Sequence, residues 1–107
     1  PYTYSVVIEN VQEPDYFTEK LLDCLLCGTI PIYWGAPNIA AYFNVHGMVI
    51  CNNLAELKDS IQILLQSSVG SKLAISNVTI EHNRNIALAY SNLPQRITDT
   101  ILTLNRP

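Results

Sequence analysis

Lys20 is the residue of this sequence whose type and position best suit chemistry on an anion. It falls near the first turn of a predicted helix, where the helix macrodipole is positive and a cation is mildly unfavourable. A lysine tolerated there makes sense if an anion binds, because free backbone N–H groups and the ammonium group then converge on it. The alternative is a solvated lysine that pairs with Glu19 or Asp23. The position of the charge alone favours this simpler alternative.

A strand, a loop and a helix must position Lys20 within one short stretch. Residues 5–8 (Ser-Val-Val-Ile) are uncharged and mostly β-branched, which is typical of a strand buried on both faces of a parallel sheet. Apolar residues then recur at helical spacing at Phe17, Leu21, Cys24 and Leu25. Gly28 is a natural helix stop, and Asp15 is the predicted cap at the start. Loops at the carboxyl ends of strands form the ligand crevice of an open α/β sheet, so an anion site is expected here.

A second strand is predicted over residues 30–34, although Pro31 cannot donate to a strand ladder. Either this strand begins in effect at Ile32, or Pro31 faces an unpaired side. Parallel pairing with the first strand would put the Gly35 turn on the same rim as Asn10. Gly35 then either lets the backbone approach a ligand closely or serves as an ordinary turn glycine.

The rest of the chain continues the α/β alternation. The predicted elements are a short helix or turn over 38–43 capped by Asn38, a strand over 48–51, a helix from Asn53 with a capping-box pattern, a weaker helical region to about residue 90, and a final helix from Pro94. We expect the strands at 6–8, 32–34 and 48–50 to be parallel neighbours with helices packed against them.

Composition narrows the classes of function. With 107 residues, of which 49% are hydrophobic and 14% charged, the chain can form one globular domain. A net charge of −3 argues against non-specific nucleic-acid binding, which uses a basic face. No apolar run approaches the length of a membrane span. Because the sequence lacks an initiating Met and enters a buried strand almost at once, it is interpreted as a fragment of a longer protein.

No metal site is predicted. Cys24 and Cys27 form a C-x-x-C pattern, but it lies inside a predicted helix without a second ligand pair, so buried free thiols are favoured over a zinc site. The aspartates never form the Asp-x-Asp pair with which many sugar-nucleotide enzymes hold a metal and a diphosphate. A diphosphate bound here would have to be met by Lys20, backbone N–H groups and hydroxyls.

Three sequence blocks stand in order around Lys20. They are residues 8–10 (Ile-Glu-Asn), 16–21 (Tyr-Phe-Thr-Glu-Lys-Leu) and 28–37 (Gly-Thr-Ile-Pro-Ile-Tyr-Trp-Gly-Ala-Pro). In composition and spacing they resemble the C-terminal, donor-binding half of the α-1,3-fucosyltransferase family, and the likeness covers Tyr4 to Cys51 well. One position departs: the family usually has a small hydroxyl residue after the asparagine, where this chain has Val11.

The resemblance implies a fold and an activity. The fold would be α/β, with a Rossmann-like three-layer parallel sheet that forms the C-terminal half of a GT-B type glycosyltransferase. Residues 1–107 would form an incomplete nucleotide-sugar (donor) binding domain, with C-terminal helices from about residue 71 to 107. The activity would be inverting transfer of fucose from the donor GDP-fucose to a glycan acceptor, with no cofactor and no obligatory metal.

The resemblance also implies site residues. The donor-contacting positions of the family match Asn10, Tyr16, Glu19 and Lys20, and the pocket rim would include Glu9 and Gly35. Lys20 would bind the phosphates as a point charge, Tyr16 would donate its hydroxyl to a phosphate oxygen, and Glu19 would accept hydrogen bonds from sugar hydroxyls. Asn10 would fix the loop or contact the sugar-phosphate. The catalytic base, a carboxylate, would lie in a missing N-terminal domain, so no catalytic residue is expected here and the fragment alone should be inactive.

Two other interpretations remain open at this point. The first is a related GT-B transferase that uses another nucleotide sugar. It stays open because no residue in the sequence is identified as recognising the base or the C6 methyl group. A non-catalytic α/β binding module of the receiver type would need an acidic cluster and a phospho-accepting aspartate at its strand ends, and neither is found. The expected partners are the donor, the glycan acceptor and the N-terminal domain. The compartment would be the Golgi lumen for a eukaryotic source and the cytoplasm for a bacterial or viral one.

Overall fold

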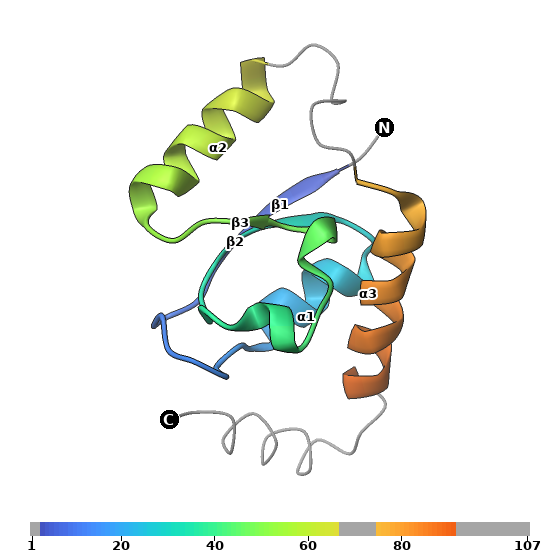
Figure 1. Cartoon of the computed structure of the whole chain (residues 1–107). Helices are drawn as coiled ribbons and strands as arrows, with labels where there is room; N and C mark the ends of the chain where they lie inside the picture. Colours follow the sequence, from blue (N-terminus) through green and yellow to red (C-terminus); the bar gives the residue numbers. More distant parts are fainter. Residues whose placement is uncertain (1–2, 67–74, 92–107) are drawn as a thin grey trace.

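A three-stranded parallel sheet between two helical layers forms the part of the chain that the computed structural model describes, residues 3–66 and 75–91 (Figure 1). The strands, in spatial and chain order, are β1 (Tyr4–Ile8), β2 (Ile30–Trp34) and β3 (Val49–Ile50). One face is covered by α1 (Glu19–Leu26) and α3 (Asn77–Ser91), and the other by α2 (Leu54–Gln66). Two 3-10 helices, η1 (Ile39–Ala41) and η2 (Val45–Gly47), connect β2 to β3. The predicted α/β class with parallel neighbouring strands is confirmed.

The register places the carboxyl ends of β1 and β2 level with each other. Ile8 pairs with Trp34, and the N–H of Glu9 donates to the carbonyl of Trp34 at 3.0 Å. The loop that follows β1 and the turn that follows β2 therefore share one rim, as the sequence predicts.

Pro31 is accommodated inside β2 by the short length of β3. The N–H of Ile30 donates to the carbonyl of Thr3, towards β1, so the next N–H position along the strand faces the β3 side. β3 pairs with β2 only from Ile32 onward. The missing N–H of Pro31 therefore faces a side of the described sheet that has no strand at that level, which confirms the second of the two predicted arrangements.

Thr18, and not Asp15, caps α1. Thr18 has an extended backbone, and its Oγ1 accepts a hydrogen bond from the N–H of Lys20 at 3.3 Å. Asp15 lies three residues earlier with a backbone φ of 64°, and its carboxylate binds Asn38 instead. The predicted Asp15 cap is therefore wrong, because a contact distant in sequence takes the side chain away from the helix.

Gly28 ends α1 as predicted. Its φ of 71° lies in the left-handed region, where glycine carries no steric penalty. The N–H of Gly28 donates to the carbonyl of Leu25 at 3.0 Å, and the N–H of Thr29 donates to that of Cys24 at 3.3 Å. This pair of bonds is a Schellman motif, which satisfies carbonyls that the helix end leaves open.

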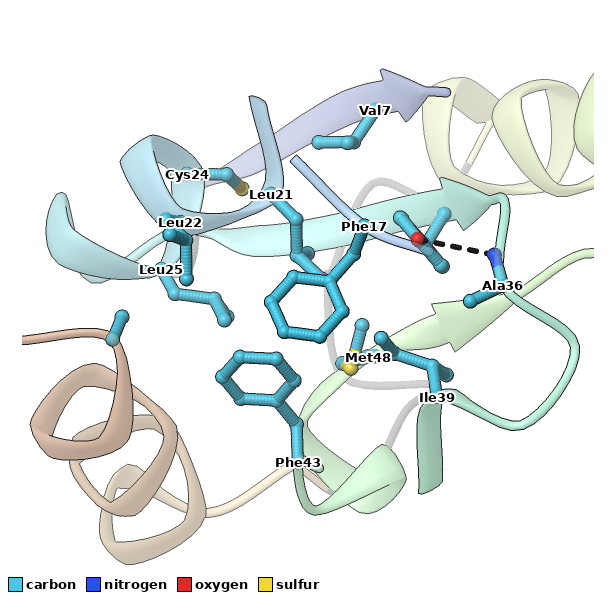
Figure 2. Packing of buried hydrophobic residues seen from close by; sticks show 12 residues of the cluster. Val7, Phe17, Leu21, Leu22, Cys24, Leu25, Ala36, Ile39, Phe43 and Met48 are labelled. Carbon is cyan, nitrogen blue, oxygen red and sulfur yellow. Dashed lines mark hydrogen bonds between the residues drawn. The ribbon is translucent and has the colours of Figure 1, made fainter. Parts of the chain in front are cut away.

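The main core lies between the sheet and the α1–α3 layer, with Phe17 at its centre (Figure 2). Phe17 is fully buried, and the rings of Tyr42, Phe43 and Tyr90 meet it edge-on, with centroids 5.1, 5.5 and 5.6 Å away. Figure 2 shows the rings of Phe17 and Phe43 lying next to each other. Because these rings come from the β2–β3 connection and from α3, they anchor the loop that precedes α1.

The opposite face of the sheet is covered only in part. α2 packs Leu57 and Ile61 against Ile32, and on β1 Tyr4 packs against the same cluster. On β1, Val6 and Ile8 remain 48% and 42% exposed, whereas Val7 on the α1 side is 5% exposed. The prediction of a strand buried on both faces is therefore wrong for the described residues, because α2 lies over β2 and β3.

Helices α2 and α3 agree with the later predictions. α2 begins close to the predicted capping-box pattern: the N–H of Glu56 donates to Asn53 Oδ1 at 2.9 Å, while Glu56 Oε1 accepts at 3.0 Å from the N–H of Asn52, one residue before the cap. α3 occupies the region of weaker helical pattern. The predicted final helix from Pro94 lies outside the described residues, as do residues 71–74 of the expected helical region. None of the described helices has the length and apolarity needed to cross a membrane.

Candidate functional site

Lys20 and Asn10 meet at the rim where β1 ends. Asn10 follows the strand directly, and Lys20 is the second residue of α1. The Lys20 ammonium donates to Asn10 Oδ1 at 3.1 Å and to the carbonyl of Ile8 at 3.4 Å. Two residues that the sequence assigned to one site are thus in direct contact, and both are exposed.

No carboxylate neutralises Lys20 within the described ranges. The ion pair found there joins Arg84 to Glu81 at 3.2 Å, on α3. The alternative of a lysine paired with Glu19 or Asp23 is therefore contradicted. Lys20 is held by two neutral oxygens, and an ammonium has three N–H bonds, so one donor remains for a ligand.

Glu9 lies beneath the rim rather than on its surface. Its side chain is 2% exposed, and its carboxylate accepts from the N–H of Thr18 at 3.0 Å, from the Thr18 hydroxyl at 2.6 Å and from the Tyr33 hydroxyl at 3.2 Å. The Tyr33 oxygen in turn accepts from the N–H of Ala36 at 3.2 Å, which is the dashed line in Figure 2. One carboxylate thus ties the start of α1 to the ends of β1 and β2.

The positive end of α1 is therefore faced by an anion of the chain itself. The carboxylate of Glu9 binds Thr18, the N-cap, where the helix dipole favours negative charge. The N–H groups of Lys20 and Leu21 donate to Oγ1 and to the carbonyl of Thr18, respectively. Internal acceptors therefore hold the N–H groups of Thr18, Lys20 and Leu21, so these three groups do not converge on an external anion. The Lys20 ammonium keeps one donor for a ligand.

Gly35 is buried against Glu9 and Tyr33, not exposed on the rim. A Cβ at this position would lie 2.4 Å from the Tyr33 hydroxyl oxygen and 2.6 Å from Cγ of Glu9, distances that real Cβ atoms do not show. The glycine is thus required by close packing inside the protein. The sequence offered a ligand approach or a simple turn, and internal packing was not among those alternatives.

Gly35→Ala is expected to destabilise the protein by about 1–3 kcal/mol, the usual cost of overpacking a filled interior. Urea unfolding followed by circular dichroism would measure it. Gly28→Asn is the comparison variant: no atom lies within 4 Å of its Cβ, so any loss of stability there reports the positive φ and not packing. Equal stability of the Gly35→Ala variant and the wild type would contradict the packing role.

Tyr16 and Glu19 lie close to Lys20 in the chain. Glu19 is exposed in the first turn of α1, next to Lys20, and Tyr16 is half-buried in the preceding loop. Burial and then the charge of Glu9 raise the pKa of Tyr33, and Tyr16 contributes to the same shift, which places it within electrostatic reach of the strand ends. Asn10 and Lys20 are thus joined directly, while Tyr16 precedes the N-cap of α1 by two residues and Glu19 is the first residue of α1. Donor contact by these four residues stays a prediction.

A cluster that the sequence did not predict joins the two halves of the rim. We call Asp15, Asn38 and Tyr42 the rim cluster. The N–H of Asp15 donates to Asn38 Oδ1 at 2.7 Å, while Asn38 Nδ2 and the Tyr42 hydroxyl donate to Asp15 Oδ1 at 2.6 and 2.7 Å. Asp15 and Asn38 were each assigned to a helix cap, and the separation of 23 residues between them gives no local signal of their pairing.

These hydrogen bonds determine the protonation states of Asp15 and Tyr42. The hydrogen bonds from Tyr42 and then Asn38 lower the pKa of Asp15 below its ordinary value. The hydrogen bond to Asp15, with a smaller contribution from burial, raises the pKa of Tyr42 to about 12. At neutral pH Asp15 is therefore an anion and Tyr42 a neutral donor, the combination that gives a strong charge-assisted hydrogen bond.

No metal-binding group was found within residues 3–66 and 75–91, where no three His, Cys, Asp or Glu side chains are grouped to hold an ion. Cys24, Cys27 and Cys51 form no disulfide; Cys24 and Cys51 are buried as predicted, whereas Cys27 is exposed, which corrects the prediction of burial for that thiol. Burial raises the pKa of the Cys24 and Cys51 thiols, which keeps them protonated.

A parallel sheet with polar side chains gathered at the carboxyl ends of its strands defines a class of α/β protein that binds its ligands at that rim. Within this class the family is shown by sequence: the family model described as Glycosyltransferase family 10 (fucosyltransferase) C-term matches residues 1–69, and the chain belongs to this family. The resemblance seen in the three sequence blocks is thereby confirmed.

Curated relatives extend this finding. An α-(1,3)-fucosyltransferase of Helicobacter pylori is 35% identical over 63 residues, which cover 59% of this chain and 13% of the relative. The α-(1,3)-fucosyltransferase B of Drosophila melanogaster is 34% identical over 96 residues, 77% of this chain and 22% of the relative. GDP-fucose protein O-fucosyltransferase 3 of Danio rerio is 47% identical over 38 residues, 36% of this chain and 8% of the relative. The chain thus spans less than a quarter of these relatives, and no solved structure matches it.

Proposed function

We propose that this chain is the donor-binding half of a GT-B type fucosyltransferase and that GDP-fucose binds at the rim of β1 and β2. The observation that carries the proposal is the Lys20 ammonium, held beside Asn10 without a carboxylate partner in the described part of the chain. Membership of the fucosyltransferase family supports it, as does the donor printed in the name of the Danio rerio relative.

Each rim residue has a distinct part in this proposal. Lys20 meets the diphosphate with its remaining N–H, and Asn10 orients the ammonium from 3.1 Å. Tyr16 donates its hydroxyl to a phosphate oxygen, and Glu19, exposed beside Lys20, accepts hydrogen bonds from ribose or sugar hydroxyls. Glu9 holds the helix start below them and does not touch the donor, because it is buried and its carboxylate is bound to Thr18 and Tyr33.

The proposed reaction is a displacement at the anomeric carbon of fucose, with inversion. The acceptor hydroxyl oxygen forms the new bond as the bond to the β-phosphate oxygen breaks, and that electron pair leaves with GDP. A carboxylate in an N-terminal domain takes the acceptor proton, and that domain holds most of the glycan. Negative charge grows on the diphosphate in the transition state, so the Lys20 ammonium stabilises the transition state more than the bound donor. No metal ion has a part in this proposal.

Nucleotide titration by calorimetry tests the proposal. GDP is expected to bind at least about tenfold more tightly than GMP, because a charge-assisted contact to the second phosphate contributes about 1.5–3 kcal/mol. Lys20→Ala should remove most of this difference. Lys58→Ala is the matched control, since Lys58 is an exposed lysine on α2, which covers the face of the sheet opposite to α1.

The same titration separates the alternatives. Equal affinity for GDP and UDP would favour a transferase that uses another nucleotide sugar. Failure to bind either nucleotide would contradict the donor site and favour a non-catalytic α/β module.

A further inference from the structure

Asp15 adopts a backbone conformation that its surroundings must maintain. Its φ of 64° is the one positive value found at a non-glycine residue within the described ranges. Left-handed backbone is sterically unfavourable for an L-residue, and Asp tolerates it better than most. Such a conformation persists only where neighbouring groups hold it, and it is most frequent at functional sites.

The rim cluster supplies the groups that hold Asp15. The backbone N–H and the carboxylate of Asp15 both bind Asn38, which closes a reciprocal pair of hydrogen bonds, and the Tyr42 hydroxyl adds a third. Asn38 precedes η1 but makes no capping bond to it, so its side chain serves Asp15 instead. The cluster therefore joins the β1–α1 loop to the segment that follows β2.

This junction immobilises the short segment that carries Tyr16. On one side of Tyr16, Asp15 is bound to Asn38 and Tyr42. On the other side, Phe17 is fully buried and meets the ring of Tyr42 edge-on, with ring centroids 5.1 Å apart. The N–H of Tyr16 also donates to the carbonyl of Glu13 at 3.3 Å. Tyr42 contributes to both anchors, through its hydroxyl and through its ring.

We propose that Asp15, Asn38 and Tyr42 are positioning residues that hold Tyr16 in its donor-binding place before the donor arrives. The inference rests on the proposed function, in which Tyr16 contacts the donor phosphates. A segment that is already ordered loses less conformational entropy on binding, so the cluster strengthens donor affinity without touching the reacting atoms. Its loss should therefore raise KM for the donor while kcat changes less than twofold.

Three variants dissect the cluster while sparing its surroundings. Tyr42→Phe removes the hydroxyl and keeps the ring that packs on Phe17. Asn38→Ala removes the reciprocal pair of hydrogen bonds. Asp15→Gly removes the carboxylate but leaves a residue that adopts positive φ freely, so loss of the side chain is separated from backbone strain. Asp59→Asn and Asn85→Ala, at exposed positions on α2 and α3, are the controls.

GDP affinity of the protein is the first measurement. Tyr42→Phe and Asn38→Ala are expected to weaken GDP binding about 3–10-fold each, in line with the net contribution of one or two hydrogen bonds. The controls should bind GDP as the wild type does. Because the three residues act as one unit, adding Asn38→Ala to Asp15→Gly should weaken binding less than the product of the two single effects.

Amide hydrogen exchange without nucleotide is the second measurement. Loss of the cluster should speed exchange at the N–H of Tyr16, while the N–H of Thr18 stays protected because Glu9 holds it separately. If the wild type binds GDP and the variants bind it equally tightly, the positioning role is wrong and the proposed function stands. Faster exchange at Thr18 as well would overturn it in favour of general destabilisation. A wild type that does not bind GDP would overturn the proposed function and this role with it.

Discussion

Lys20→Ala is expected to lower kcat/KM of the transferase about 10²–10³-fold, the usual effect of removing one preorganised group that stabilises transition-state charge. The ammonium is held at the end of β1 by two neutral oxygens, so its full charge is available as the bond to the diphosphate breaks. Folding stability should change by less than about 0.5 kcal/mol, because Lys20 is exposed and forms no ion pair within the described ranges.

Steady-state kinetics and a thermal melt on the same samples would measure both quantities. Lys20→Arg should recover only part of the activity, since a planar guanidinium does not replace a compact ammonium held between Asn10 and the β1 carbonyl. Lys58→Ala, the exposed control on α2, should match the wild type. If Lys20→Ala kept full activity, or lost activity only to the extent that it unfolds, the role in transition-state stabilisation would be wrong. Lys20 would then be an ordinary solvated surface charge.

Glu9→Ala is expected to destabilise the protein by about 3 kcal/mol or more. The substitution leaves the N–H and hydroxyl of Thr18 and the hydroxyl of Tyr33 without their acceptor, and each buried donor left unsatisfied costs about 1–3 kcal/mol. For a domain of this size, the melting temperature should fall by about 10–20 °C. A thermal melt followed by circular dichroism is the direct measurement.

Glu81→Ala is the matched control for Glu9. Glu81 is an exposed carboxylate whose ion pair with Arg84 should contribute no more than about 1 kcal/mol. The double variant Glu9→Ala with Thr18→Val tests whether the two residues form one unit: its loss of stability should be smaller than the sum of the single losses. If Glu9→Ala melted at the same temperature as the wild type, the Glu9 carboxylate would belong to the exposed rim, as the sequence suggested.

The order of elements and the position of the rim could be predicted because both follow from local pattern. Residues 5–8 and the apolar repeat from Phe17 to Gly28 differ in period, which separates strand from helix before any tertiary contact is known. Parallel pairing then brings the end of β1 level with the end of β2. The contact between Asn10 and Lys20 agrees with this reasoning, since both were placed at the same strand end.

The features that the sequence analysis missed depend on contacts between distant residues. Asp15 and Thr18 are both good N-caps, and the choice between them is made by Glu9 and Asn38, which bind one each. Gly35 looks like any turn glycine until Tyr33 is seen beside it. The exposure of one face of β1 depends on where α2 packs, and an apolar run gives no information about that.

The unpaired edge of β1 affects how the protein behaves in solution. In the described sheet β1 pairs with β2 on one side only, so a row of its N–H and C=O groups is open on the other side, next to the exposed side chains of Val6 and Ile8. Such an edge is a template on which another strand can add, and apolar side chains beside it favour aggregation as concentration rises. The candidate site lies at the ends of the strands and not along this edge. Chains that associate edge to edge would therefore keep the rim open to nucleotide, and loss of solubility and loss of binding would be separate events.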